Sequence, residues 1–204
     1  MTSFGAADFI GESNAYDAST VALTSASSKT AMGIAFCLKW LDSNVELVGL
    51  TSPGNREFCK EIGYYDRVVT YEELEQLGDS SLALIDLSGN EAILQELAET
   101  AGEHLLRTVI VGATHWQDRE RSMTAAAPNT EFFFLPTWIE KRRVDWGPAA
   151  FVERSDEAWS AFAPTVESWM QIDEHHGVDE IAAVYASVLG ANSRPEAGFV
   201  LQFS

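Results

Sequence analysis

The chain has 204 residues, 46% of them apolar, and a net charge of −18 from 31 acidic and 13 basic residues. That length suffices for one sizeable hydrophobic core, whereas so negative a field repels nucleic acid and anionic lipid surfaces. We therefore expect no nucleic acid or membrane as a partner, and any bound phosphate must rely on local backbone N–H groups and a few basic side chains.

The expected compartment is the cytoplasm. The first residues, MTSFGAADFIGESNAYD, lack the basic and apolar regions of a signal peptide, and no apolar run approaches the ~20 residues that cross a bilayer. Cys37 and Cys59 fall inside predicted helices and are too few for a disulfide scaffold, so we interpret them as small buried hydrophobic residues in a reducing setting.

Short apolar runs typical of strands alternate with helical runs from residue 21 to about residue 143. The strands are expected at 21–24, 45–50, 67–70, 82–87, 108–111 and 131–135. The helices are expected at 30–40, 56–62, 72–77 and 91–101, with Asn55 and Asn90 as N-terminal caps and Gly63 as a C-terminal stop. This alternation predicts an α/β fold, a Rossmann-type doubly wound parallel sheet of about six strands.

After Pro136 the pattern changes to a helical C-terminal extension. Helices are expected at 138–143, 158–170 and 177–189, and the tail at 198–203 alternates like a lone strand with no evident partner nearby. We therefore expect a connector at 1–17, the α/β core at 18–136, and an extension with a terminal strand at 137–204 packed as the same domain. The terminal strand could join a sheet of a second copy, which would make a homo-oligomer.

The segment VALTSASSKTAMG, residues 21–33, joins the first expected strand to the first expected helix. A helix N-terminus exposes N–H groups and partial positive charge, which favour phosphate. Dinucleotide-binding folds usually have G-x-G-x-x-G here, whereas this turn is made of small and hydroxyl residues with one lysine. We expect the backbone N–H groups of residues 27–31 to hold a pyrophosphate, and the candidate residues of the turn are Ser25, Ala26, Ser27, Ser28, Lys29 and Thr30.

Two alternatives stay open for this turn. It could be a serine-rich helix cap without a ligand. It could also imitate a P-loop, because Ser-Lys-Thr resembles Gly-Lys-Thr, but that motif needs glycines at the positions of Leu23 and Ser28.

The end of the second expected strand indicates which dinucleotide would bind. An acidic residue there binds the ribose 2′-hydroxyl of NAD, whereas basic or hydroxyl residues accommodate the 2′-phosphate of NADP. This strand end has no acid and offers Thr51, Ser52, Arg56 and Lys60, so NADP(H) is the expected cofactor. The alternative is that Arg56 and Lys60 are solvated surface charges.

The loops after the next strands complete the expected groove, since ligands lie beyond the carboxyl ends of such strands. Ser88 and Gly89, and then Gly112, Ala113 and Thr114, would line the ribose and nicotinamide. His115 follows them and is interpreted as a surface histidine.

Other catalytic patterns do not emerge. No tyrosine is followed by the lysine of a Tyr-x-x-x-Lys pair, and no G-x-S-x-G elbow is present. His175 and His176 suggest a metal site, but adjacent side chains point in different directions, so we interpret them as an exposed polar turn. No residue is assigned the role of a general acid or base, and no metal is expected.

Three segments together resemble the cofactor half of the medium-chain dehydrogenase/reductase superfamily, especially its quinone oxidoreductase-like branch. They are VALTSASSKTAMGIAFCLK, VELVGLTSPGNREFCKEIGYYDRVVTYEEL and the terminal GFVLQF. The resemblance adds Tyr71, after the third strand, to the cofactor residues. The serine-rich turn looks most like an uncharacterised group within that superfamily, catalogued as a domain of unknown function.

The resemblance implies an NADP(H)-binding oxidoreductase-like protein of the quinone or enone reductase type. Relatives would carry a catalytic domain before this point, and residues 4–9 look like the connector that follows it, so the chain resembles the cofactor half alone, truncated or naturally short. The alternative function is a non-catalytic Rossmann module that senses a nucleotide or forms oligomers.

Overall fold

The computed structural model describes residues 1–112, 129–190 and 193–203. They form two compact units, Met1–Trp159 and Ser160–Ser204. The boundaries expected at residues 17 and 136, and the packing of residues 137–204 as part of the core domain, stay predictions.

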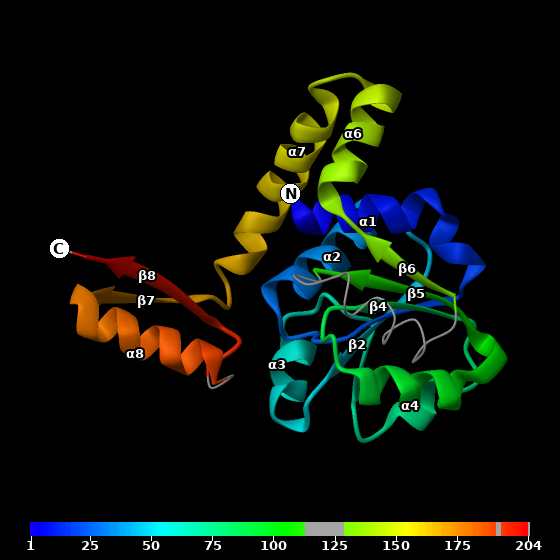
Figure 1. The fold of residues 1–204 in the computed structure, drawn as a ribbon, viewed down its shortest axis with the longest axis horizontal. Helices are drawn as coiled ribbons and strands as arrows, with labels where there is room; N and C mark the ends of the chain where they lie inside the picture. Colours follow the sequence, from blue (N-terminus) through cyan, green and yellow to red (C-terminus); the bar gives the residue numbers. More distant parts are fainter. Residues whose placement is uncertain (113–128, 191–192, 204) are drawn as a thin grey trace. The chain divides into compact units, whose positions relative to one another are not determined.

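The first unit is built on a six-stranded parallel sheet in the order β3-β2-β1-β4-β5-β6 (Figure 1). The strands are β1 (Thr20–Leu23), β2 (Glu46–Thr51), β3 (Arg67–Thr70), β4 (Leu82–Asp86), β5 (Leu105–Val111) and β6 (Thr130–Phe133). The predicted doubly wound sheet is confirmed. The order reverses between β1 and β4, and open sheets of this kind bind ligands beyond the carboxyl ends of the strands at that reversal.

Helices precede, connect and follow the strands. They are α1 (Thr2–Glu12), α2 (Lys29–Trp40), α3 (Arg56–Glu61), α4 (Glu91–Ala101), α6 (Leu135–Trp146) and α7 (Ala150–Val166), with 3₁₀ turns η1 (Asn14–Asp17), η2 (Pro53–Asn55), η3 (Leu74–Leu77) and η4 (Gly102–His104). Asn90 caps α4 as predicted, because its side chain accepts the N–H groups of Ala92 and Ile93.

Helix α1 lies within the expected connector at 1–17, whose role as a connector stays a prediction. Two expectations about elements are wrong. The expected helix at 72–77 is instead the 3₁₀ turn η3. The expected strand at 131–135 ends at Phe133, and Pro136 is the second residue of α6, because the fixed φ of proline suits the first turn of a helix.

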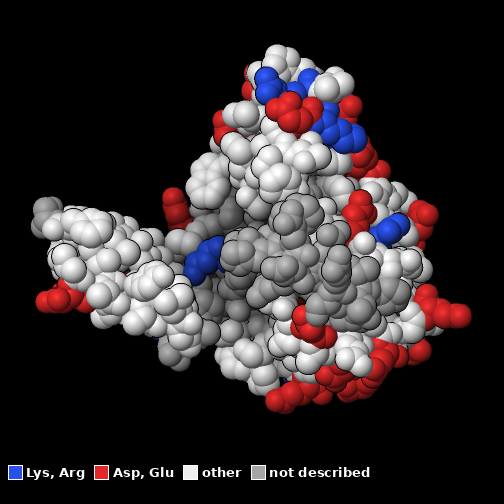
Figure 2. All heavy atoms as spheres, in the orientation of Figure 1, with Lys and Arg blue, Asp and Glu red and all other residues white. Residues whose placement is uncertain are grey.

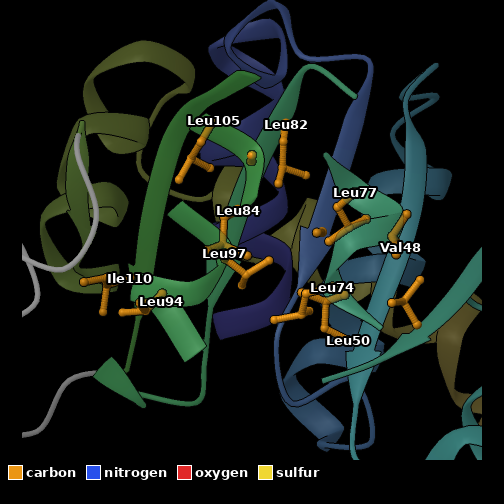
Figure 3. Close-up of a cluster of buried hydrophobic side chains, with 13 residues drawn as sticks. Val48, Leu50, Leu74, Leu77, Leu82, Leu84, Leu94, Leu97, Leu105 and Ile110 are labelled. Carbon is orange, nitrogen blue, oxygen red and sulfur yellow. The ribbon is translucent and has the colours of Figure 1, made fainter. Parts of the chain in front are cut away.

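The core lies between the sheet and the helices that cover it. Every residue of β1 and β4 is buried, as expected for strands covered on both faces. Figure 3 shows one cluster, in which leucines of η3 and α4 meet aliphatic side chains of β2, β4 and β5. The cluster is closed by Leu74 and Leu77, so the short turn after β3 is held in place mainly by apolar burial.

A buried ion pair joins α1 to α6. Asp8 and Arg142 are 7% and 6% exposed, and Arg142 Nε donates to Asp8 Oδ2 at 2.6 Å. Trp138 Nε1 donates to the same oxygen at 2.8 Å. The guanidinium also lies over the rings of Trp138 and Trp146, at 4.5 and 4.3 Å from their centroids. The two tryptophans therefore pack against this guanidinium.

The second unit contains β7 (Gln171–His176), α8 (Gly177–Leu189) and β8 (Ala197–Gln202), and its two strands pair in parallel. The terminal strand thus has a partner, contrary to expectation, and the histidines end that partner strand and do not form a turn. The sequence QIDEHH does not predict a strand, because it lacks alternating apolar residues, and the strand is recognised only from its pairing with β8. Helix α8 has the predicted bounds.

The surface carries its charge unevenly. On the face shown in Figure 2, acidic side chains gather over α4, where Glu91, Glu96 and Glu99 are exposed. None of the helices in the described part of the chain is both long and apolar enough to cross a membrane.

Candidate functional site

The candidate site begins at the turn between β1 and α2. Residues 24–28 leave the carboxyl end of β1, and Ser28 caps the helix, because its Oγ accepts the Ala31 N–H at 3.2 Å. The turn therefore presents a helix N-terminus at the point where the strand order reverses, which is the geometry that favours an anion.

Several backbone donors of the turn already have partners. The N–H of Ser28 donates to Ser25 O at 2.8 Å, and the Ala31 N–H is used by the cap. Ser25 N–H donates to the Tyr71 hydroxyl at 2.8 Å, and Ala26 N–H donates to the Leu50 carbonyl of β2. Among the donors expected at residues 27–31, the N–H groups of Ser27 and Thr30 donate to no acceptor in the described residues. These two are the amides open to a ligand.

Serine takes the place of glycine in this turn. Ser25 has φ +51, a left-handed conformation that glycine adopts freely and other residues adopt at a cost of about 1 kcal/mol. The backbone thus reaches a glycine-like geometry without a glycine. Non-glycine residues held in such conformations cluster at ligand sites.

Tyr65, in the loop between α3 and β3, supports the turn. Its hydroxyl donates to the Ala26 carbonyl at 2.8 Å, and burial raises the pKa of Tyr65 well above its usual value, so the hydroxyl stays a donor. The ring packs on Gly49 so closely that a Cβ there would lie 2.9 Å from it. Gly49 thereby gives Tyr65 its place under the turn.

The candidate residues at the end of β2 differ in their exposure to solvent. Thr51 is 1% exposed, whereas Ser52 is exposed at the surface. Asn55 occupies the predicted N-cap position of α3, but its side chain makes no cap hydrogen bond, and its Nδ2 donates instead to Ser27 Oγ at 3.0 Å. This bond joins the loop after β2 to the turn between β1 and α2.

Arg56 follows Asn55 and faces the loop after β3. Its Nη1 contacts both carboxylate oxygens of Glu73, at 3.1 and 3.0 Å. Arg56 Nε is buried and has no hydrogen-bond partner among the described residues. Lys60 instead pairs with the exposed Glu57 on the outer side of α3, at 2.8 Å.

Asp86 organises the carboxyl end of β4. It is fully buried, and its Oδ1 accepts the hydroxyls of Thr24 and Ser88, each at 2.7 Å. Its Oδ2 accepts the Gly89 N–H at 3.0 Å. Ser88 and Gly89 are therefore fixed next to β1, where the strand order reverses.

The groove predicted after β5 is described only at its start. Gly112 is exposed and has φ +87. Ala113, Thr114 and His115 lie outside the described residues.

Four residues of the site were not among the predictions: Asn55 as a turn contact, Tyr65, Glu73 and Asp86. Two of them had a signal in the sequence. Thr70 and Glu73 have the spacing of a capping box, and Asp86 ends a buried apolar run where an acid needs donors. The roles of Asn55 and Tyr65 depend on contacts between distant segments, and no sequence signal indicated them.

The site fits a phosphate-bearing cofactor in three respects. Two open amides lie at the start of α2, and a guanidinium with an unused donor lies near the end of β2. The turn between β1 and α2 is held by hydrogen bonds with four other positions, Leu50, Asn55, Tyr65 and Tyr71. No described group of three or more histidine, cysteine, aspartate or glutamate side chains could hold a metal ion.

Sheet order and turn together define a protein of the Rossmann-type α/β class. The chain belongs to the family described as protein of unknown function (DUF2855), whose model matches residues 1–193. A search of curated proteins found no match.

Solved structures share the fold at low identity. The quinone oxidoreductase from Coxiella burnetii is 14% identical, with a TM-score of 0.59 over 96% of this chain and 57% of that one. The CurK enoyl reductase is 14% identical, with a TM-score of 0.61 over 99% and 60%. CurA from Vibrio vulnificus, solved in complex with NADPH, is 12% identical, with a TM-score of 0.55 over 100% and 63%. The predicted resemblance to these reductases is confirmed for the fold, and the chain spans less than two thirds of their length.

Proposed function

We propose that the chain binds NADP(H) as an oxidoreductase-like protein. The observation that carries the proposal is the pair of open amides, Ser27 and Thr30, at the start of α2. Ser27 is bonded to Asn55, the residue before Arg56, so amides and guanidinium lie along one edge of the sheet. That edge offers donors for a pyrophosphate and a cation for a third phosphate.

Each candidate residue then has a proposed place. The turn from Ser25 to Thr30 holds the pyrophosphate, and Tyr71 supports it through Ser25. Arg56 and Ser52 take the adenosine 2′-phosphate, with Lys60 adding charge nearby, while Thr51 contributes through the backbone because its side chain is buried. The ribose and nicotinamide would lie along Ser88, Gly89, Gly112, Ala113 and Thr114.

The proposed reaction class is reduction of a quinone or enone. Nicotinamide, when bound, supplies the hydride, and the protein orients it. The residues of this chain bind the phosphates and fix the ribose, and none of the described ones is placed as a general acid or base. Two proteins of similar fold are a quinone oxidoreductase and an enoyl reductase, which supports this class.

Separate calorimetric titrations with NADPH and NADH test the proposal. We expect NADPH to bind more tightly, and Arg56→Ala to remove the difference while leaving NADH binding unchanged. Arg143→Ala is the matched control, because Arg143 also pairs with one carboxylate, at 3.0 Å, but lies on α6. Equal weak binding of both cofactors by the unaltered protein would contradict the assignment.

A second candidate function is an oligomer-forming module. The observation that favours it is the two-stranded sheet of the second unit, in which Val200 and Leu201 of β8 are 39% and 41% exposed. Two strands alone are marginally stable, and an open edge can pair with another chain. We propose that β8 pairs with a second copy. Light scattering should then show a dimer that Val200→Asp dissociates, and a monomeric unaltered protein would contradict it.

The cytoplasm stays the proposed compartment. Cys37 and Cys59 are buried free thiols, as predicted, and burial raises the pKa of each to about 11. Thiols of this kind are unreactive and suit a reducing setting.

A further inference from the structure

We propose that Glu73 sets the cofactor preference of this site by competing with the adenosine 2′-phosphate for Arg56. The inference rests on the proposed function, because it concerns the same phosphate position. It adds Glu73, a residue that would lower the affinity for NADP(H). Glu73 lies outside the pattern of residues at the end of β2.

Glu73 is held in place independently of Arg56. Its Oε2 accepts the Thr70 hydroxyl at 2.9 Å and the Thr70 N–H at 3.3 Å, while Thr70 O accepts the Glu73 N–H at 3.0 Å. The glutamate side chain reaches back to the Thr70 N–H as in one half of a capping box, and the Thr70 hydroxyl adds a second donor. The carboxylate therefore stays at the end of β3 whether or not Arg56 contacts it.

Arg56 is the partner of this ion pair that can move away from the other. It contacts Glu73 through Nη1 alone, and its Nε has no partner among the described residues. A guanidinium binds a phosphate best with two parallel N–H donors. Turning toward a phosphate would thus engage more of its donors than the present pair does.

Charge decides the direction of the effect. In the structure the two cations near the end of β2 are each matched by a carboxylate, Arg56 by Glu73 and Lys60 by Glu57. A dianionic 2′-phosphate therefore meets a locally neutral site, and it must compete with a carboxylate for the guanidinium. The 2′-hydroxyl of NADH carries no charge and meets no such competition.

The consequence is a specific asymmetry between the two cofactors. Removing the charge of Glu73 should favour NADPH and leave NADH nearly unchanged. Both side chains are about one third exposed, so the screened effect is modest, about fivefold in affinity.

The test is a set of calorimetric titrations with NADPH and NADH. Glu73→Gln keeps the shape of the side chain and removes its charge. Glu72→Gln is the matched control, because Glu72 is the exposed neighbour and its substitution changes the net charge equally. Arg56→Ala, alone and combined with Glu73→Gln, shows whether the effect passes through the guanidinium.

We expect Glu73→Gln to tighten NADPH about fivefold and NADH less than twofold, Glu72→Gln to change neither, and the gain to vanish without Arg56. Equal gains from Glu73→Gln and Glu72→Gln, or weaker NADPH binding by Glu73→Gln, would overturn the inference while leaving the proposed function intact, provided Arg56→Ala still removes the NADPH preference. If the unaltered protein binds neither cofactor, the proposed function fails and the inference with it.

Discussion

The hydroxyl of Thr24 donates to Oδ1 of Asp86 at 2.7 Å, and both residues are fully buried. The same hydroxyl accepts the N–H groups of Leu87 and Ser88, at 2.8 and 3.1 Å. One side chain thus joins the carboxyl ends of β1 and β4, the two strands between which the sheet reverses its order. The proposed cofactor groove lies directly beyond this connection.

Thr24→Val should destabilise the protein by about 2–3 kcal/mol, because it keeps the shape of the side chain but leaves buried polar groups unpaired. Urea denaturation measures the loss. Thr20→Val, at the other end of β1, is the control and should cost less, since the Thr20 hydroxyl makes one bond, to Glu46 at 3.2 Å. Equal losses for both variants would show that the connection at Asp86 has no special role.

Gly49→Ala should disturb the turn between β1 and α2 through Tyr65 and Ala26. The added Cβ would lie 2.9 Å from the Tyr65 ring and 3.0 Å from Ala26 Cβ, so the ring must shift and the bond from Tyr65 to Ala26 weakens. We expect a loss of about 1–3 kcal/mol in unfolding free energy and weaker binding of NADPH and NADH alike.

The control for this change is Gly54→Ala, where nothing lies within 4 Å of the added Cβ. It should leave both stability and binding nearly unchanged. If Gly49→Ala behaves like Gly54→Ala, Tyr65 does not hold the turn as the geometry indicates.

Ser25 allows a test of the left-handed turn. Ser25→Gly should keep stability within about 0.5 kcal/mol, because relief of the left-handed strain at φ +51 offsets the greater entropy of an unfolded glycine. Ser25→Val should cost more than about 1 kcal/mol, since a β-branched residue rarely adopts a positive φ. Thermal denaturation of the pair decides the matter, and similar melting temperatures would argue against the left-handed conformation.

Much of this fold was readable from the sequence, because buried parallel strands are apolar throughout and alternate with helices. The order of the strands was not predicted and comes from the structure. Strand β7 of the small sheet was missed, since QIDEHH is polar and becomes a strand only through pairing with β8.

The site was predictable in outline only. The turn, Arg56 and the loop after β4 follow from position along the chain, and each lies at the carboxyl edge of the sheet. Which amides stay open depends on Tyr71 and Leu50, which take two of the donors from distant segments. No local pattern in the sequence encodes those contacts.

Stability should fall in acid through Glu46. Hydrogen bonds from Arg67 hold the pKa of this carboxyl below its ordinary value of 4.5. The folded protein therefore binds this proton less readily than the unfolded chain, so the contribution of Glu46 is complete above pH 4.5 and is lost as pH falls through the lower folded pKa.

Urea denaturation of the Glu46→Gln variant between pH 3 and pH 7 would test this. The variant should be less stable than the unaltered protein at neutral pH, and the two stabilities should converge in acid. A difference that stays constant across this range would contradict the assignment.

The open amides of the turn between β1 and α2 can be observed directly by nuclear magnetic resonance of the ¹⁵N-labelled protein during titration with NADPH. The account predicts that the amide signals of Ser27 and Thr30 shift most within the turn, saturating together with the signals around Arg56. Saturable NADPH binding that leaves the Ser27 and Thr30 signals in place would contradict it, because the pyrophosphate would then rest elsewhere.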